Sequence, residues 1–156
     1  MVFLGTQYTS AVTGNAFAYS IKLSRNIRSG SHSLEFLVND SYGNSGIASA
    51  GFRVESVPTR MVNTLSSNSV RPGEPFTVSV SVYDQADDAM KSVVSITVAD
   101  SSGAVVLSAS NTTGGITQLS FPTGQKPGRY TLASKALGLA EASPVLVEDF
   151  EDASVS

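Results

Sequence analysis

One segment of this chain is repeated once, 98 residues further on, inside a pattern that otherwise alternates between apolar and polar residues. The sequence GSHSL at 30–34 returns as GRYTL at 128–132, and Ile21 and Leu23 before the first copy have apolar counterparts at the same spacing before the second. A period near 100 residues is the length of one small domain. The chain is therefore predicted to contain two consecutive modules of one kind.

Strict alternation predicts that these modules are built of strands. The clearest run is 76–83, where the apolar residues Phe76, Val78, Val80 and Val82 fall on one face and Thr, Ser and Tyr fall on the other. Outward positions that are mostly Ser and Thr are typical of half-buried antiparallel sheets. In the first module strands are predicted over 17–23, 32–39 and 50–55. After Pro58 seven are predicted, over 61–69, 75–84, 92–100, 104–110, 116–121, 129–137 and 142–149.

Turn signals containing Gly, Pro, Asn or Asp separate the strands, at 71–73, 100–103, 111–115 and 126–128. Residues 132–142 are rich in Leu and Ala, which favours a helix, but the period of two continues through them and predicts a strand. Seven strands are the number expected of an immunoglobulin-like (Ig-like) sandwich. The predicted fold class is therefore all-β, with tandem Ig-like antiparallel β-sandwich modules.

The first module is predicted to be incomplete. Only 29 residues precede Gly30, whereas about 70 separate Pro58 from the equivalent Gly128. The predicted domains are a partial module at 1–57, which supplies the C-terminal strands, a complete seven-stranded sandwich at 58–149, and an acidic tail or the start of a following domain at 150–156. An incomplete sandwich exposes an apolar face. We therefore expect residues 1–57 either to pack against the second module or to exchange strands with another copy of the chain.

Charge and composition exclude several classes of function. The net charge is −3, and the 1–57 region carries four basic and three acidic groups. Neither half has the basic surface that phosphate neutralisation requires, so no nucleic-acid partner is expected. The absence of cysteine removes disulfides and thiol catalysis. No apolar run approaches the ~20 residues that span a bilayer, so no membrane insertion is expected.

Two residues of the repeat stand out as structural or functional candidates. Tyr130 follows a Gly-containing turn at the start of the sixth predicted strand, where Ig-like sandwiches place a tyrosine corner whose hydroxyl bonds the preceding backbone. The equivalent position in the first module holds His32, the one histidine of the chain. A general base or a metal ligand is the functional interpretation of His32. Because the other copy has tyrosine in the same place, a structural role is favoured.

Other candidate sites rest on small clusters. Asp84, Asp87 and Asp88 lie in one predicted loop and carry the oxygen ligands that Ca²⁺ prefers, but the spacing fits no EF-hand. The sequence therefore leaves calcium binding by these three residues open. Asn39 and Asn111 begin glycosylation sequons, and Asn111 is placed in a predicted hairpin tip. Asp40 and Asn44 are expected to bond the local backbone of their turn.

Three segments together resemble known bacterial modules. The GSHSL sequence at 30–34, the turn at 38–44 and the apolar strand at 52–54 resemble the last two strands of prokaryotic Ig-like repeats, which read G-x-H-x-L and then D-x-x-G-N. The second module resembles the macroglobulin-like and Ig-like domains of exported bacterial proteins, although it lacks the D-x-x-G-N turn. Residues 147–152 resemble the opening strand of jelly-roll carbohydrate-associated modules, with a solvated acidic tail as the alternative.

The resemblance implies a non-catalytic spacer or scaffold region of a larger secreted or cell-surface bacterial protein, such as a polysaccharide-associated or S-layer protein. Its partners would be the neighbouring domains, with self-association through the first module as a further expectation. The alternative is an adhesion module for a glycan or a protein, for which the outward Tyr42 and Tyr83 are candidates. No catalytic, cofactor-binding or metal-binding residue is predicted, because no motif names a reaction.

Overall fold

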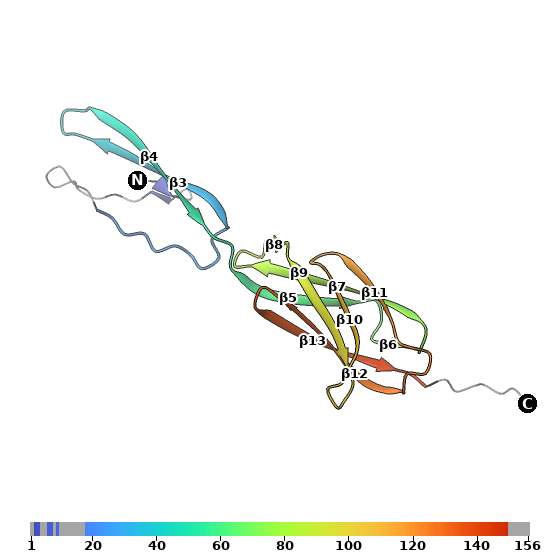
Figure 1. Cartoon of the computed structure of the whole chain (residues 1–156). Coiled ribbons are helices and arrows are strands. Elements are labelled where there is room, and N and C mark those ends of the chain that lie inside the picture. The colour runs from blue at the N-terminus through green and yellow to red at the C-terminus, as the bar shows by residue number, and fades with distance from the viewer. Residues whose placement is uncertain (1, 4–5, 8, 10–17, 150–156) are drawn as a thin grey trace, which may run out of the picture. The chain divides into compact units, whose positions relative to one another are not determined.

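The computed structural model describes residues 2–3, 6–7, 9 and 18–149 (Figure 1). The described residues form strands and connecting turns, with no helix, and so the protein is all-β as predicted. No segment of the described residues is a helix that could cross a membrane. The chain divides into two compact units, Met1–Val57 and Pro58–Ser156.

Two sheets form the second unit, and their hydrogen bonding is antiparallel except between β13 and β6. One sheet has the strand order β11-β7-β5, with the short β8 also paired to β7, and the other has the order β10-β9-β12-β13-β6. The strands are β5 (Pro58–Leu65), β6 (Ser69–Val70), β7 (Pro75–Asp84), β8 (Ala89–Met90), β9 (Val93–Ala99), β10 (Val105–Thr112), β11 (Ile116–Ser120), β12 (Gly128–Ala136) and β13 (Leu139–Val147).

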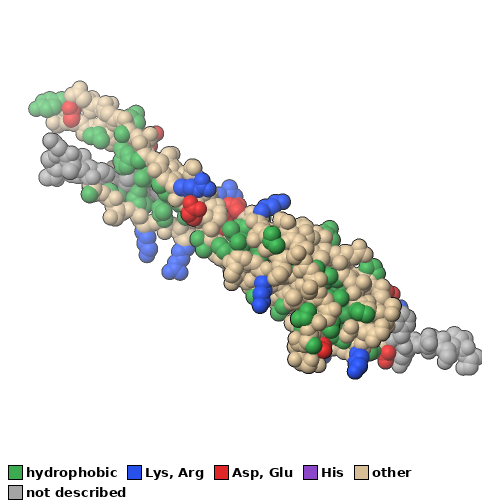
Figure 2. Space-filling model, viewed as in Figure 1, with side chains coloured by type: hydrophobic (Ala, Val, Ile, Leu, Met, Phe, Trp, Pro, Cys, Tyr) green, Lys and Arg blue, Asp and Glu red, His purple; other side chains and the backbone are tan. Residues whose placement is uncertain are grey.

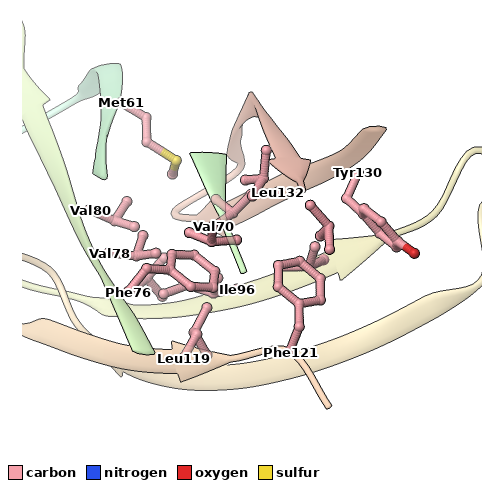
Figure 3. Packing of buried hydrophobic residues seen from close by; sticks show 14 of the residues in the cluster. Met61, Val70, Phe76, Val78, Val80, Ile96, Leu119, Phe121, Tyr130 and Leu132 are labelled. Carbon is pink, nitrogen blue, oxygen red and sulfur yellow. The ribbon is translucent and has the colours of Figure 1, made fainter. Parts of the chain in front are cut away.

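Both sheets turn their apolar faces toward one shared core, which makes the unit a β-sandwich (Figure 3). Along β7 every second side chain is buried, as the alternation predicted, and Val78 is 0% exposed. In the facing sheet Leu132 and Val98 are equally buried. The cluster consists of Met61, Val70, Phe76, Val78, Val80, Val82, Val94, Ile96, Val98, Leu119, Phe121, Tyr130, Leu132, Ala136, Val145 and Val147.

The strand predictions for the second unit are largely confirmed, with bounds that differ by one or two residues for most strands and by more for the first and the last. The segment predicted at 61–69 begins earlier, at Pro58, and ends at Leu65. The last strand begins at Leu139, because Leu137 and Gly138 form a tight turn in which both residues have positive φ. β6 and β8 were not predicted as separate strands, since a two-residue strand is too short to show any alternation.

The described residues of the first unit form one four-stranded sheet with the order β2-β1-β3-β4. Its strands are β1 (Val2–Phe3), β2 (Thr6–Gln7), β3 (Gly30–Asn39) and β4 (Ser45–Val54). β3 and β4 form a long hairpin, paired from Gly30 with Val54 to Asn39 with Ser45. The predicted strand at 32–39 lies within β3, and the one predicted at 50–55 is part of the longer β4.

The predicted strand at 17–23 is wrong for its described residues, because 18–24 belong to no sheet. The equivalent stretch of the second unit, β11, is a strand because it pairs with β7. No described residue of the first unit supplies a partner equivalent to β7. Alternation indicates which side chains face an apolar surface, and Tyr19, Ile21 and Leu23 do line an apolar groove. A strand also needs a neighbouring backbone.

Candidate interaction surface

The prediction of a tyrosine corner is confirmed at Tyr130. Its hydroxyl donates to the carbonyl oxygen of Lys126, four residues upstream, at 2.8 Å, and accepts from the side-chain amide of Gln125 at 2.6 Å. The ring is buried and contacts Phe121, with 5.1 Å between centroids. Figure 3 shows the Tyr130 oxygen pointing away from the apolar cluster. A buried ring with a satisfied hydroxyl fixes the crossover that leads into β12.

The same corner recurs at His32 in the first unit. The His32 Nε2 atom lies 2.7 Å from the carbonyl oxygen of Arg28, again four residues upstream. Because a carbonyl oxygen can only accept, Nε2 carries the proton and donates it. Gly30 and Gly128, at the start of both copies, have positive φ. The histidine ring also stacks on Phe52 at 5.5 Å. These contacts favour the structural interpretation of His32.

Three aspartates, Asp40, Asp84 and Asp100, close three turns by one common geometry. In each turn the Oδ1 atom accepts the backbone N–H groups of the residues two and four positions later, at distances between 2.8 and 3.0 Å. The backbone N–H of each aspartate also donates to the carbonyl oxygen four residues later. The expectation that Asp40 bonds its local backbone is therefore confirmed, and the same device recurs twice in the second unit.

Hydrogen bonding to the charged form lowers the pKa of two of these carboxyl groups. For Asp40 the largest cause is the side-chain amide of Asn44, followed by the backbone N–H of the same residue. For Asp100 it is the hydroxyl of Ser102, followed by the backbone N–H of Ala104. Each bond favours the ionised carboxylate over the neutral acid. The charged form of each carboxylate therefore stabilises the turn that it closes.

The three aspartates considered for calcium do not form a cluster. Asp84 is 2% exposed, and its Oδ1 faces its own turn. Asp87 pairs with Arg60 at 3.0 Å. Within the part of the chain that the structure describes, no three His, Asp or Glu side chains are arranged to hold a metal ion. The structure thus places the Asp84 carboxylate in its own turn and Asp87 beside Arg60, and it does not bring the three carboxylates together.

The two tyrosines considered for glycan binding differ in accessibility. The guanidinium of Arg60 covers the ring of Tyr83, with its Cζ atom 4.1 Å from the centroid. Tyr42, at the tip of the hairpin between β3 and β4, is 90% exposed. An uncovered aromatic face is what a sugar ring stacks on. Only Tyr42 of the pair presents such a face.

The predicted position of Asn111 in a hairpin tip is wrong. Asn111 belongs to the end of β10, and the next strand, β11, lies in the opposite sheet. Its side-chain amide donates to the carbonyl oxygen of Ile116 and to the hydroxyl of Thr117, both at 3.0 Å. The amide nitrogen that a glycan would occupy is therefore engaged in the crossover between sheets. Asn39, in the other sequon, is the last residue of β3 and is exposed.

The first unit presents an open apolar groove of about 500 Å³. It is lined by Ala18, Tyr19, Ile21, Leu23, Leu34, Phe36 and Phe52. Leu34 and Phe36 lie two residues apart in β3 and therefore share one face of the hairpin. Their partners in β4 are Ala50 and Ala48. Figure 2 shows hydrophobic side chains at the surface of this unit. Leu23 is 40% exposed and Ile47, on the other face, 72%.

Comparisons with known proteins give no family for the chain. No protein-family model matches it, and no curated protein matches it. Among solved structures, the crystal structure of dimeric latent PorU from Porphyromonas gingivalis is similar over 78% of this chain, at 20% sequence identity and a TM-score of 0.39. The present chain covers 12% of the PorU chain. Similarity of this degree does not define an activity.

Proposed function

We propose that this chain is a non-catalytic spacer or scaffold region of a larger secreted or cell-surface bacterial protein, built of immunoglobulin-like modules. The observation that carries the proposal is the corner repeated at a spacing of 98 residues. Tyr130 bonds the carbonyl of Lys126, and His32 bonds that of Arg28, at matching positions. Repeated modules whose equivalent residues support the fold are typical of serial architectures that hold other domains at a distance.

The strand order of the second unit supports the immunoglobulin-like assignment. In that fold the first, second and fifth strands share one sheet, and the third, sixth and seventh share the other. The seven long strands of the second unit follow this division, with β5, β7 and β11 in one sheet and β9, β12 and β13 in the other. The fourth, β10, lies beside β9, as an added edge strand does in variable-type domains.

The segment between the two units also has the features of a domain boundary. Three residues separate the end of β4 at Val54 from the start of β5 at Pro58, and Val57 among them is 55% exposed. Domain boundaries fall in exposed segments of this kind. We therefore treat the two units as modules in series.

The test exchanges the second module within the full-length gene of the source organism. Replacing residues 58–149 with an unrelated sandwich of equal length should leave surface display and activity of the whole protein unchanged, because a spacer contributes length and stiffness. Deleting the same residues should impair both. Loss of activity on exchange, to the same extent as on deletion, would show that particular surface residues matter and would overturn the spacer role.

Adhesion is the second candidate function, and the exposure of Tyr42 favours it. The ring stands at a hairpin tip that Asp40 holds in shape. If the chain binds glycans, Tyr42→Ala should abolish retention on a glycan array, while Tyr83→Ala, at a ring already covered by Arg60, should leave it intact. Equal retention by both variants would refute a role for Tyr42.

A further inference from the structure

The outer edge of β4 differs from the other sheet edges in length and regularity. β4 pairs with β3 through ten consecutive residues without a register shift, and its other side has no neighbouring strand among the described residues. The backbone groups along such an edge can pair with another strand. A row of this length can form a complete additional ladder.

Each edge of the second unit is shorter or irregular. β11 has five residues and β6 has two. β5 begins with a proline and has a register shift before Arg60. β10 has a shift between Val105 and Leu107. Short strands, proline and bulges are the features by which proteins prevent unwanted pairing of edges. β4 has none of them.

The repeat shows what the equivalent edge does in the second unit. Because Gly30 pairs with Val54 as Gly128 pairs with Val147, β13 takes the place of β4. β13 has the parallel strand β6 beside its last two residues. The corresponding end of β4, at Arg53 and Val54, has no such strand among the described residues.

The β4 edge also lacks charge that would repel a second copy. Residues 45–52 contain neither a charged side chain nor a proline. The one charged residue of the strand, Arg53, pairs with Glu55 of its own chain at 3.3 Å. A neutral edge meets no like-charge penalty when it faces itself.

We propose that two copies of this chain associate through β4, which pairs antiparallel with the β4 of the second copy about a two-fold axis. Such an axis runs perpendicular to the sheet, so that each side chain keeps its face. With Ala50 opposite its own copy, Ala48 lies opposite Phe52 and Gly46 opposite Val54. On the face that carries Phe52 and Val54, each large side chain then meets a small one, and the apolar faces of the two hairpins become continuous. This inference concerns the first unit and does not depend on the spacer role.

The first test measures the association of the full chain by sedimentation equilibrium. We expect a reversible dimer that Ser49→Lys weakens by about tenfold or more, because the substitution places like charges across the new ladder. Within its own hairpin Ser49 lies opposite Glu35, so a lysine there finds an opposite charge and the hairpin is retained. The control is Ser108→Lys on the edge strand β10, which should leave association unchanged.

The second test uses the absence of cysteine from the chain. Ala50→Cys introduces a single thiol at the proposed axis, where antiparallel partners approach closely enough for a disulfide. Mild oxidation should give a covalent dimer, and Ser110→Cys on β10 should not. A concentration-independent monomer, or a dimer that neither Ser49→Lys nor Ala50→Cys affects, would overturn the proposal. So would a monomer in which the β4 amides that point away from β3 are protected from exchange, since the edge would then be occupied by its own chain.

Discussion

At the scale of single residues, two different side chains make one bond in equivalent places. Tyr130 reaches the carbonyl of Lys126 through a phenol, and His32 reaches that of Arg28 through an imidazole. Both place a donor at the end of a flat ring, and both donate to a carbonyl four residues upstream. The repeat within the sequence was enough to identify the shared position. The bond was predicted only for tyrosine, because a phenol hydroxyl always carries a donor, whereas the donor of a neutral imidazole can be on either ring nitrogen.

Removal of the corner hydroxyl should destabilise the second unit. Tyr130→Phe keeps the buried ring but leaves the carbonyl of Lys126 without this donor, and we expect a loss of about 1 kcal/mol in the free energy of unfolding. Urea denaturation measures it. Tyr83→Phe is the control, since Tyr83 contacts Arg60 through its ring face. An unchanged urea midpoint for Tyr130→Phe would show that the hydrogen bond of the corner does not stabilise the unit.

The tautomer of His32 is a second expectation at this scale. Because the ring donates from Nε2 to the carbonyl of Arg28, the neutral imidazole should be the Nε2–H form. Long-range ¹H–¹⁵N correlation spectra resolve the two tautomers, and this chain has one histidine to assign. A predominant Nδ1–H form at neutral pH would contradict the corner geometry.

The Asp100 turn makes the stability of the second unit depend on pH. The folded-state pKa of Asp100 lies below its ordinary value of 3.8, chiefly because Ser102 bonds the carboxylate. A lowered folded pKa means that the contribution is present above pH 3.8 and is lost as the pH falls through the folded pKa. Asp100→Asn, which still offers an oxygen acceptor, should flatten this acid dependence in urea titrations. An acid dependence identical to that of the parent would exclude Asp100 as a source.

At the scale of elements, the hairpin between β12 and β13 has a turn that its sequence does not favour. Leu137 has φ of 51° and Gly138 has φ of 81°, the pattern of a type I′ turn, in which Asn-Gly is preferred. Leucine in the left-handed region is strained. The side chain of Leu137 is 44% exposed and contributes little packing in return.

Leu137→Asn should therefore stabilise the second unit by about 0.5–1 kcal/mol, because asparagine tolerates positive φ. Thermal unfolding measures the change. Leu137→Ala provides the control, since alanine removes the same apolar contacts without relieving the backbone. If both variants are destabilised equally, side-chain packing rather than turn strain governs this position.

Strands were predictable from sequence where one face meets a core, as in β7, whose predicted bounds of 75–84 are those observed. Which strands pair with one another could not be predicted from the sequence. Residues 18–23 alternate as β11 does but have no described partner, and Asn111 precedes a turn that changes sheets and closes no hairpin. Alternation and turn residues are local signals, whereas sheet membership is decided by segments far away in the sequence. The β4 edge was not predicted from the sequence for the same reason. Whether a strand lies at the edge of a sheet depends on whether another segment pairs with its second side.

At the scale of the molecule, the second unit has a complete apolar core of its own. Val78, Val98 and Leu132 are fully buried within it. Residues 58–149 expressed alone should therefore unfold in one cooperative transition with a β-type circular dichroism spectrum. Agreement between the calorimetric and van't Hoff enthalpies provides the check. A gradual, noncooperative melt would show that the unit needs the rest of the chain.

The parallel pairing of β6 with β13 has a mechanical consequence. Leu146 donates to the carbonyl of Asn68 at 2.8 Å, and Glu148 donates to that of Val70 at 3.0 Å. Tension that reaches β6 from its N-terminal side and β13 from its C-terminal side pulls these two parallel strands in opposite directions. Parallel strands loaded in this way slide in shear, so their hydrogen bonds bear the force together and do not peel apart one at a time.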